Sequence, residues 1–189
     1  MQFLYYALFA AGIVAVDQLS KYFTVAYIPL YTDISFIPGV LNLTYVQNSG
    51  AAFSSFEGQQ WLFALIFLFF TGLIVWEYFK KKMAFTPFER WCIAAIYGGG
   101  FANMVDRLRM GYVVDMIETA FVDFPVFNVA DCFITCGCVL LMAVVSGFAL
   151  WGWNSSPEPG RDTLPGKRRY GWITFGLTVA FIVFVSLWT

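Results

Sequence analysis

Long apolar stretches separated by polar connections run through most of the chain. Five of them approach the roughly 20 apolar residues that an α-helix needs to cross a bilayer. They cover about residues 3–28, 61–79, 91–106, 128–151 and 172–188. Between the first two, residues 41–45 alternate apolar and polar positions as a strand does, and Pro38 and Gly39 predict a turn before them. The pattern predicts a mainly α, polytopic membrane protein with a small antiparallel β element in the first outer loop.

The amino-acid composition supports a membrane protein and excludes several catalytic mechanisms and metal sites. The chain is 60% hydrophobic and 12% charged, whereas a soluble domain carries about 25% charged residues. A net charge of −1 offers no basic face, so we expect no nucleic-acid partner. The absence of histidine excludes Ser-His-Asp catalysis, Cys-His catalysis and every His-ligated metal site. The four cysteines lie in apolar runs, and we expect buried, inert thiols rather than a metal pair at Cys132 and Cys136.

The distribution of basic residues predicts the orientation of the helices, because Lys and Arg concentrate in cytoplasmic loops. Eight of the 11 flank the second-to-third and fourth-to-fifth connections: Lys80, Lys81, Lys82, Arg90, Arg161, Lys167, Arg168 and Arg169. The N-terminus is then cytoplasmic and the C-terminus outside. No basic residue precedes the first apolar run and no small-x-small cleavage site precedes Asp17, so we expect a permanent span there.

The same topology divides the chain into three parts. Residues 1–153 form a membrane-embedded domain, with outer loops at 29–60 and 107–127. Residues 154–170, with three prolines and two glycines, form a cytoplasmic linker, and residues 171–189 form an extra C-terminal transmembrane helix.

Polar residues within and beside the apolar stretches gather at one level of the predicted membrane. At 1.5 Å per residue, Asp17 lies roughly 24 Å across the first helix and Asn103 roughly 20 Å across the third. Asp131 lies at the outer end of the fourth. Further polar residues at this level are Asn48, Asp106, Arg107, Asp115 and Asn128. Because ionisable groups in a membrane are costly, they indicate a functional site near the outer face.

Structural interpretations exist for the same residues. Asp17 and Lys21, four residues apart, can form an ion pair on one helix. Asn103, Asp106 and Arg107 share a helix face and can form a hydrogen-bond network between helices.

Three further features have structural alternatives as well. Asp131, near a helix start, can act as a partner of the helix dipole, and Asp115 can be an ordinary loop acid. The run Gly98, Gly99 and Gly100 lies at mid-membrane with no strand before it, which favours close helix packing over a phosphate-binding loop.

Five short motifs resemble those of the lipoprotein signal peptidase (signal peptidase II) family of membrane aspartic peptidases. They are DQLSK at 17–21, NSGAAF at 48–53, NMVDR at 103–107, GYVVD at 111–115 and FNVAD at 127–131. Their order, spacing and topological level agree over about residues 3–150. Ala102 and Met116 stand where the family usually has Gly and Phe. The family typically has four transmembrane helices, so the fifth predicted helix is an addition.

The resemblance implies an aspartic endopeptidase with Asp115 and Asp131 as catalytic carboxylates, one activating a water and the other polarising the scissile carbonyl. Its implied substrate is a diacylglyceryl-modified prolipoprotein, cut just before the lipidated Cys at the outer face of the bacterial cytoplasmic membrane. Substrate-binding or supporting roles fall to Asp17, Lys21, Asn48, Gly50, Asn103, Asp106, Arg107, Asn128 and Ala130. The resemblance implies no metal or cofactor, and we expect a monomer surrounded by membrane lipid.

Three other functions compete at this stage. A Ser-Lys peptidase would use Ser20 and Lys21, which point about 100° apart on a helix, or would pair Lys21 with Ser49 or Ser54. A small ion- or proton-coupled transporter or channel component would use the intramembrane charges, but these do not line a route across the membrane. A structural membrane subunit would use the polar cluster for assembly, which the five ordered motifs oppose.

Overall fold

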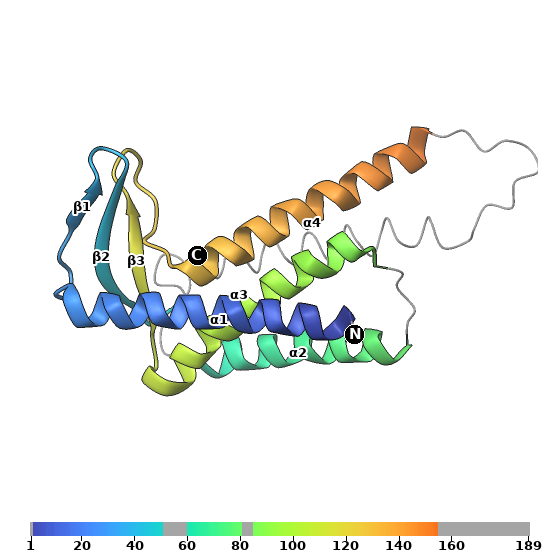
Figure 1. Cartoon of the computed structure of the whole chain (residues 1–189), viewed down its shortest axis with the longest axis horizontal. Coiled ribbons are helices and arrows are strands. Elements are labelled where there is room, and N and C mark those ends of the chain that lie inside the picture. Colours follow the sequence, from blue (N-terminus) through green and yellow to red (C-terminus); the bar gives the residue numbers. More distant parts are fainter. Residues whose placement is uncertain (1, 51–59, 81–84, 155–189) are drawn as a thin grey trace, which may run out of the picture.

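Four long helices and one small sheet make up the computed structural model, which describes residues 2–50, 60–80 and 85–154. The helices are α1 (Gln2–Tyr27), α2 (Gln60–Lys80), α3 (Pro87–Met110) and α4 (Val129–Asn154), and the strands are β1 (Ile34–Ile37), β2 (Leu41–Asn48) and β3 (Val113–Thr119). The sheet stands at one end of the helices, beside the last turns of α1 and the first turn of α4 (Figure 1). The predicted mainly α fold with a small antiparallel β element is confirmed.

The sheet is antiparallel with strand order β1-β2-β3. β3 lies in the connection between α3 and α4, so the β element is not confined to the connection between α1 and α2 where it was expected. The strand predicted at 41–45 is present and extends to Asn48. The interpretation of Asp115 as a loop acid is wrong, because Asp115 lies in β3 opposite Val46. The sequence hides β3 because its first four residues, 113–116, are all buried, which removes the alternation expected of a half-exposed strand.

Glycines let α3 approach its two neighbours closely. A Cβ at Gly98 would lie 3.0 Å from the backbone of Ala10 in α1, and one at Gly99 would lie 2.6 Å from the carbonyl oxygen of Ala130 in α4. Gly137 plays the same part from the other side, since its Cβ would lie 2.9 Å from Ile96. The close-packing interpretation is therefore confirmed for Gly98 and Gly99 of this run.

The ends of α3 are specified by local sequence. Thr86 and Glu89 form a capping box at its start, with Pro87 in the first turn. Gly111 ends the helix at φ 81°, and its N–H donates to the carbonyl oxygen of Arg107 at 3.0 Å. This left-handed turn, natural for Gly, directs the chain from α3 straight into β3.

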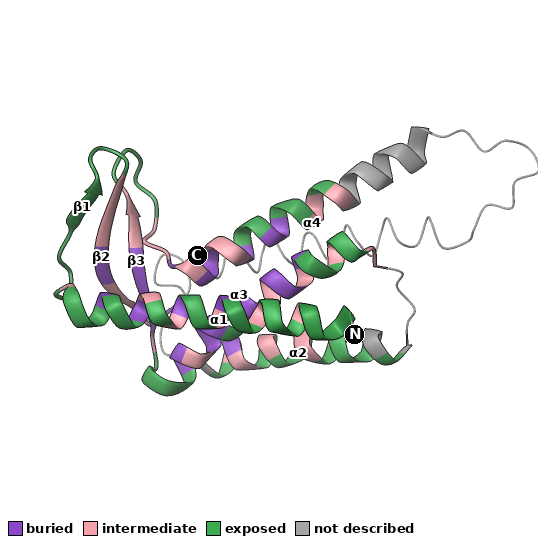
Figure 2. Cartoon of the chain, viewed as in Figure 1, coloured by how far each residue is buried: buried purple, intermediate pink, exposed green. Residues whose placement is uncertain are grey.

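Buried residues concentrate where α1, α3 and α4 meet and at the base of β2 and β3, while the outward helix faces are exposed (Figure 2). Many of those exposed side chains are large and apolar, as on a surface that contacts lipid: Phe3, Leu8, Leu19, Leu65, Phe69 and Val139 are examples. Within the described residues one helix, α1, is long and apolar enough to cross a membrane, and shorter apolar stretches occupy 61–76 and 129–144. The first four predicted apolar stretches each coincide with a helix. The predicted linker beyond Asn154, the fifth helix, Lys81, Lys82 and Ser54 lie outside the described residues.

Candidate active site

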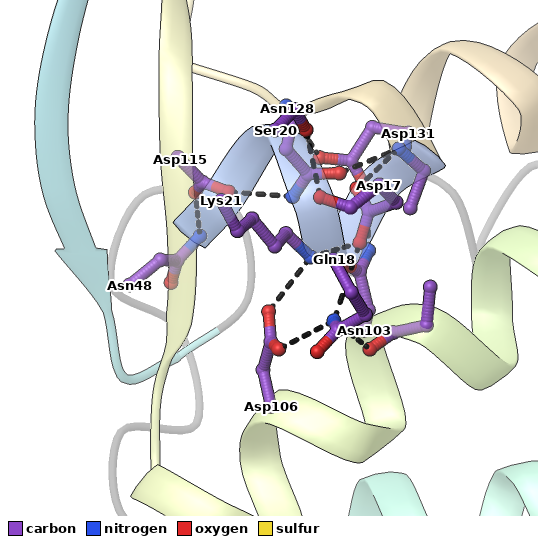
Figure 3. Close-up of polar contacts among 12 residues, drawn as sticks. Asp17, Gln18, Ser20, Lys21, Asn48, Asn103, Asp106, Asp115, Asn128 and Asp131 are labelled. Atoms are coloured by element: carbon purple, nitrogen blue, oxygen red, sulfur yellow. Dashed lines mark hydrogen bonds and ion pairs between the residues drawn. The ribbon is translucent and has the colours of Figure 1, made fainter. Parts of the chain in front are cut away.

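Asp115 projects from β3 into a buried polar cluster and is held by two amide groups. Its side chain is 3% exposed. The Nδ2 of Asn128 donates to its Oδ1 at 2.7 Å, and the Nδ2 of Asn48 donates to its Oδ2 at 3.0 Å (Figure 3). Burial, reinforced by the negative charge of Asp131, raises the pKa of Asp115 to about 7, although the two amide donors oppose this shift. The carboxyl group can therefore hold a proton near neutral pH.

Asp131 lies in the first turn of α4, where the sequence FNVAD builds a reciprocal helix cap. The backbone N–H of Asn128 donates to Asp131 Oδ2 at 3.1 Å, and the backbone N–H of Asp131 donates to Asn128 Oδ1 at 3.0 Å. The Nδ2 of Asn103 donates to the second oxygen, Oδ1, at 2.7 Å. The N-terminus of a helix carries a partial positive charge, so this position and the N–H donors offset part of the cost of burying the ionised carboxylate.

Asn128 connects the two acids, since its side chain donates to Asp115 and its backbone donates to Asp131. Asn48, Asn103 and Asn128 share one arrangement: an N–H donor holds the amide oxygen, and the amide NH₂ points to a carboxylate. The donors to the amide oxygens are Gly50 N, Lys21 Nζ and Asp131 N, respectively. Each amide is thereby fixed in the orientation that stabilises negative charge on the acids.

Lys21 is the centre of a buried ionic network between α1 and α3. Its Nζ lies 2.7 Å from Asp17 Oδ2 and 2.7 Å from Asp106 Oδ2, and it donates to Asn103 Oδ1 at 2.8 Å (Figure 3). The predicted ion pair of Asp17 and Lys21 is thus present, but Lys21 also reaches α3. Asp17 Oδ1 in turn accepts from the backbone N–H of Ala130 at 2.9 Å. The network therefore reaches the start of α4 by two routes, through Asn103 and through Ala130.

Gln18 belongs to this network and was missing from the predicted site. Its Nε2 donates to Asp106 Oδ1 at 2.7 Å and to the carbonyl oxygen of Ala102 at 3.3 Å. The signal was available, because Gln18 is a polar residue in an apolar run beside Asp17, within the DQLSK motif.

Arg107 attaches the segment after β2 to the end of α3. Its Nη2 donates to the carbonyl oxygen of Gly50 at 3.1 Å, and its guanidinium carbon lies 4.5 Å from the centre of the Phe63 ring. Gly50 also donates its N–H to Asn48 Oδ1. Gly50 therefore bonds to Arg107 through its carbonyl oxygen and to Asn48 through its N–H, and so links Arg107 to the amide that contacts Asp115.

All eleven residues predicted for the site belong to this cluster, and they come from α1, the end of β2 and the segment just after it, α3, β3 and the start of α4. Figure 3 labels eight of them: Asp17, Lys21, Asn48, Asn103, Asp106, Asp115, Asn128 and Asp131. Gly50 and Ala130 take part through backbone atoms alone. Within the ranges 2–50, 60–80 and 85–154 the structure describes no group of three or more His, Cys, Asp or Glu that could hold a metal ion. The four cysteines are free thiols; Cys92 and Cys138 are buried, but Cys136 is exposed, so the expectation that all four are buried is wrong.

The region that contains this cluster matches a known protein family. A model of signal peptidase II matches residues 9–146 and so includes every residue of the cluster. The lipoprotein signal peptidase of Streptococcus pyogenes serotype M1 is 44% identical over 130 residues, which are 69% of this chain and 85% of the relative. The chain belongs to the signal peptidase II family. It is accordingly a peptidase by family, as the sequence motifs indicated.

Two solved structures share the fold of this signal peptidase II family member. A bacterial membrane enzyme determined by the in meso method at 2.3 Å resolution superposes with a TM-score of 0.72 at 28% identity, covering 81% of this chain and 94% of that one. A second, at 1.9 Å resolution, gives a TM-score of 0.67 at 31% identity, over 74% and 91% of the two chains. The chain is therefore a membrane protein with the fold of bacterial membrane enzymes.

The structure also bears on the Ser-Lys alternative. Ser20 donates its hydroxyl to the carbonyl oxygen of Asp17 in its own helix at 2.7 Å. The Nζ of Lys21 is engaged by two carboxylates and an amide oxygen of the ionic network, and none of these partners is a serine hydroxyl. Membership of a peptidase family likewise leaves the transporter and structural-subunit alternatives without support.

Proposed function

We propose that this chain is an aspartic endopeptidase that removes the signal peptide from diacylglyceryl-modified prolipoproteins, cutting just before the lipidated Cys. The observation that carries the proposal is the sharing of Asn128 by two buried carboxylates, Asp115 and Asp131. The names of the curated relatives support the substrate class. No metal or cofactor is needed for this chemistry, because two carboxylates in different protonation states can supply both an acid and a base.

The two acids differ in a way that suggests their roles. The pKa of Asp115 is raised to about 7, so we assign the proton of the pair to this residue, which then polarises the scissile carbonyl. Asp131 is stabilised as an anion by the start of α4 and by two N–H donors, so it accepts a proton from the attacking water. The proton on Asp131 then passes to the leaving amine as the tetrahedral intermediate collapses. General acid–base steps of this kind contribute about 10²–10⁴-fold each.

The buried ionic network is proposed to position Asp131 rather than to touch substrate. Lys21 holds the oxygen of Asn103 and so directs its NH₂ to Asp131. Asp17 holds the N–H of Ala130, the residue before Asp131. Fixing a reacting group matters because a misplacement of about 1 Å can cost about 10²-fold in rate.

Residues of the outer loop are proposed to face the substrate. Asn48 contacts Asp115 directly, and Arg107 holds the adjacent Gly50 carbonyl. We further propose that the site lies at the outer face of the bacterial cytoplasmic membrane, with a cytoplasmic N-terminus and a monomeric enzyme. This location suits a substrate whose lipid arrives from the bilayer while its peptide bond meets water.

The proposal is tested by cleavage of a diacylglyceryl-modified prolipoprotein peptide by the purified full chain. Asp115→Asn and Asp131→Asn should each lower the rate by at least about 10²-fold. Asp123→Asn, a change of an exposed Asp between β3 and α4, is the matched control and should retain the wild-type rate. Full activity in Asp115→Asn or Asp131→Asn would refute the roles assigned to these two acids. A folded wild type that never cuts the peptide would refute the function.

A further inference from the structure

An apolar groove lies beside the candidate active site and has no part in the mechanism above. It has a volume of about 450 Å³ and is walled by α1, all three strands and the start of α4. Its lining includes Thr24, Ile28, Ile34, Leu43, Ile117 and Val129. An apolar cavity of about 150 Å³ is enough to hold benzene, so this groove can accept a much longer apolar ligand.

The sheet wall of the groove continues directly from Asp115. Ile34 pairs with Leu43, and Leu43 pairs with Ile117, so these three residues form one row across the sheet. Ile117 is two residues beyond Asp115 in β3. Residues two apart on a strand point to the same face and are separated by about 7 Å. The apolar row therefore begins next to the acid.

The helix walls show the same continuity. Along α1, the side that carries Asp17 and Lys21 continues at helical spacing to Thr24 and, directly after the helix, to Ile28 in the groove. At α4, the groove residue Val129 directly follows Asn128, which contacts both acids. A ligand whose reactive end lies at the acids can thus extend an apolar tail along one unbroken surface.

The outer side of the groove is continuous with the surface that faces lipid. Phe23 and Tyr27 also line it, and they are 48% and 75% exposed on α1. Among the helices that the structure describes, α1 is the one whose length and apolar character suffice to cross a membrane. The tail that fills the groove can therefore enter from the bilayer without passing through water.

We propose that this groove binds one acyl chain of the diacylglyceryl group on the substrate cysteine. The inference rests on the proposed function. In that function the lipid is attached to the residue next to the scissile bond, so its acyl chains begin within a few ångströms of Asp115 and Asp131. Moving an acyl chain from lipid to an apolar groove changes the hydrophobic free energy little, because lipid tails are as apolar as the groove. The groove consequently acts by orienting the scissile bond rather than by adding affinity.

Acyl-chain length is the variable that tests the groove. The substrates are one lipopeptide carrying either two palmitoyl or two butanoyl chains, cleaved by the full chain in detergent micelles. Wild type should prefer the long chains by about tenfold or more in kcat/KM, within the range that orientation of a reacting group provides. Ile34→Trp places a bulky ring in the groove and should abolish most of that preference. Ile37→Trp is the matched control, because Ile37 lies on the same strand, is similarly exposed and does not line the groove.

The outcomes separate the groove from the function. Equal cleavage of both substrates by wild type, or an unchanged preference in Ile34→Trp, would overturn the groove assignment and leave the peptidase intact. If wild type cuts neither substrate, the proposed function fails, and photo-crosslinking then decides the groove alone.

Crosslinking uses Asp131→Asn enzyme and a lipopeptide with a diazirine in one acyl chain. Label should appear at Leu43, Ile117 or neighbouring groove residues. Label confined to α2 would overturn the proposal. A diazirine phospholipid serves as the second source of acyl chains. If the phospholipid labels the groove and excess lipopeptide does not displace it, the groove is a general lipid site. That result would also overturn the proposal.

Discussion

Replacement of Gly99 by Ala should disable the site without touching a polar residue. A Cβ at this position would lie 2.6 Å from the carbonyl oxygen of Ala130 and 2.7 Å from Cγ1 of Ile134. Carbon–oxygen contacts are normally about 3.3–3.6 Å, so α3 and the start of α4 would have to separate by roughly 0.7 Å. One turn after Gly99, Asn103 donates to Asp131 across the same helix pair at 2.7 Å. The same displacement would lengthen that bond beyond the roughly 3.2 Å limit of a hydrogen bond.

The expected size of the effect follows from these distances. Overpacking of this kind costs about 1–3 kcal/mol of stability, and a misplaced catalytic group loses up to about 10²-fold in rate. Gly100→Ala is the matched control, since its Cβ would meet Phe67 at an ordinary 3.7 Å. In a helix interior this control should be neutral or stabilising by up to about 1 kcal/mol.

The assay compares thermal unfolding in detergent and cleavage of the lipidated peptide for Gly99→Ala, Gly100→Ala and wild type. We expect a lower melting temperature and slower cleavage in Gly99→Ala alone. If Gly99→Ala matches Gly100→Ala in both measurements, the helix contact does not position Asp131 and the reasoning is refuted.

Two further predictions concern the amide and the ammonium groups that stabilise charge in the site. Asn48→Ala removes a donor that favours the charged form of Asp115, so the pKa of Asp115 should rise above about 7 and the alkaline limb of the kcat/KM profile should move to higher pH. Lys21→Met leaves the carboxylates of Asp17 and Asp106 buried without their cation, which should cost about 3–5 kcal/mol of unfolding free energy in a detergent melt.

Controls for these two changes come from the same elements. Asn42→Ala alters an amide on β2 that bonds to Glu118, at the other end of the strand, and should leave the pH profile in place. An unmoved alkaline limb in Asn48→Ala would contradict the assigned role of Asp115. For Lys21, the second change Asp106→Asn removes one uncompensated charge and should restore part of the stability lost in Lys21→Met. No recovery would show that Lys21 acts mainly through packing.

A site residue could be predicted from the sequence when its polarity differed from that of its neighbours in the chain. Asp17, Asn103 and Asp131 interrupt apolar runs, so their cost in a membrane marked them at once. Gln18 interrupts the first apolar run in the same way, so the same signal applies to it, although it is absent from the predicted site and donates to Asp106. The strand that carries Asp115 gave no periodic signal, because its buried residues face protein on both sides.

The sequence by itself determined the membrane class, the four helices of the described chain, the family and the identity of the polar residues, because these depend on apolar length and on ordered motifs. Only the tertiary structure decided which of those residues meet. The link from Lys21 through Asn103 to Asp131 joins three helices, and its existence depends on the backbone approach that Gly99 permits. Likewise, the pairing of Ile34, Leu43 and Ile117 depends on strand register. Contacts between distant segments depend on packing distances of a few tenths of an ångström, and no local pattern of residues specifies those.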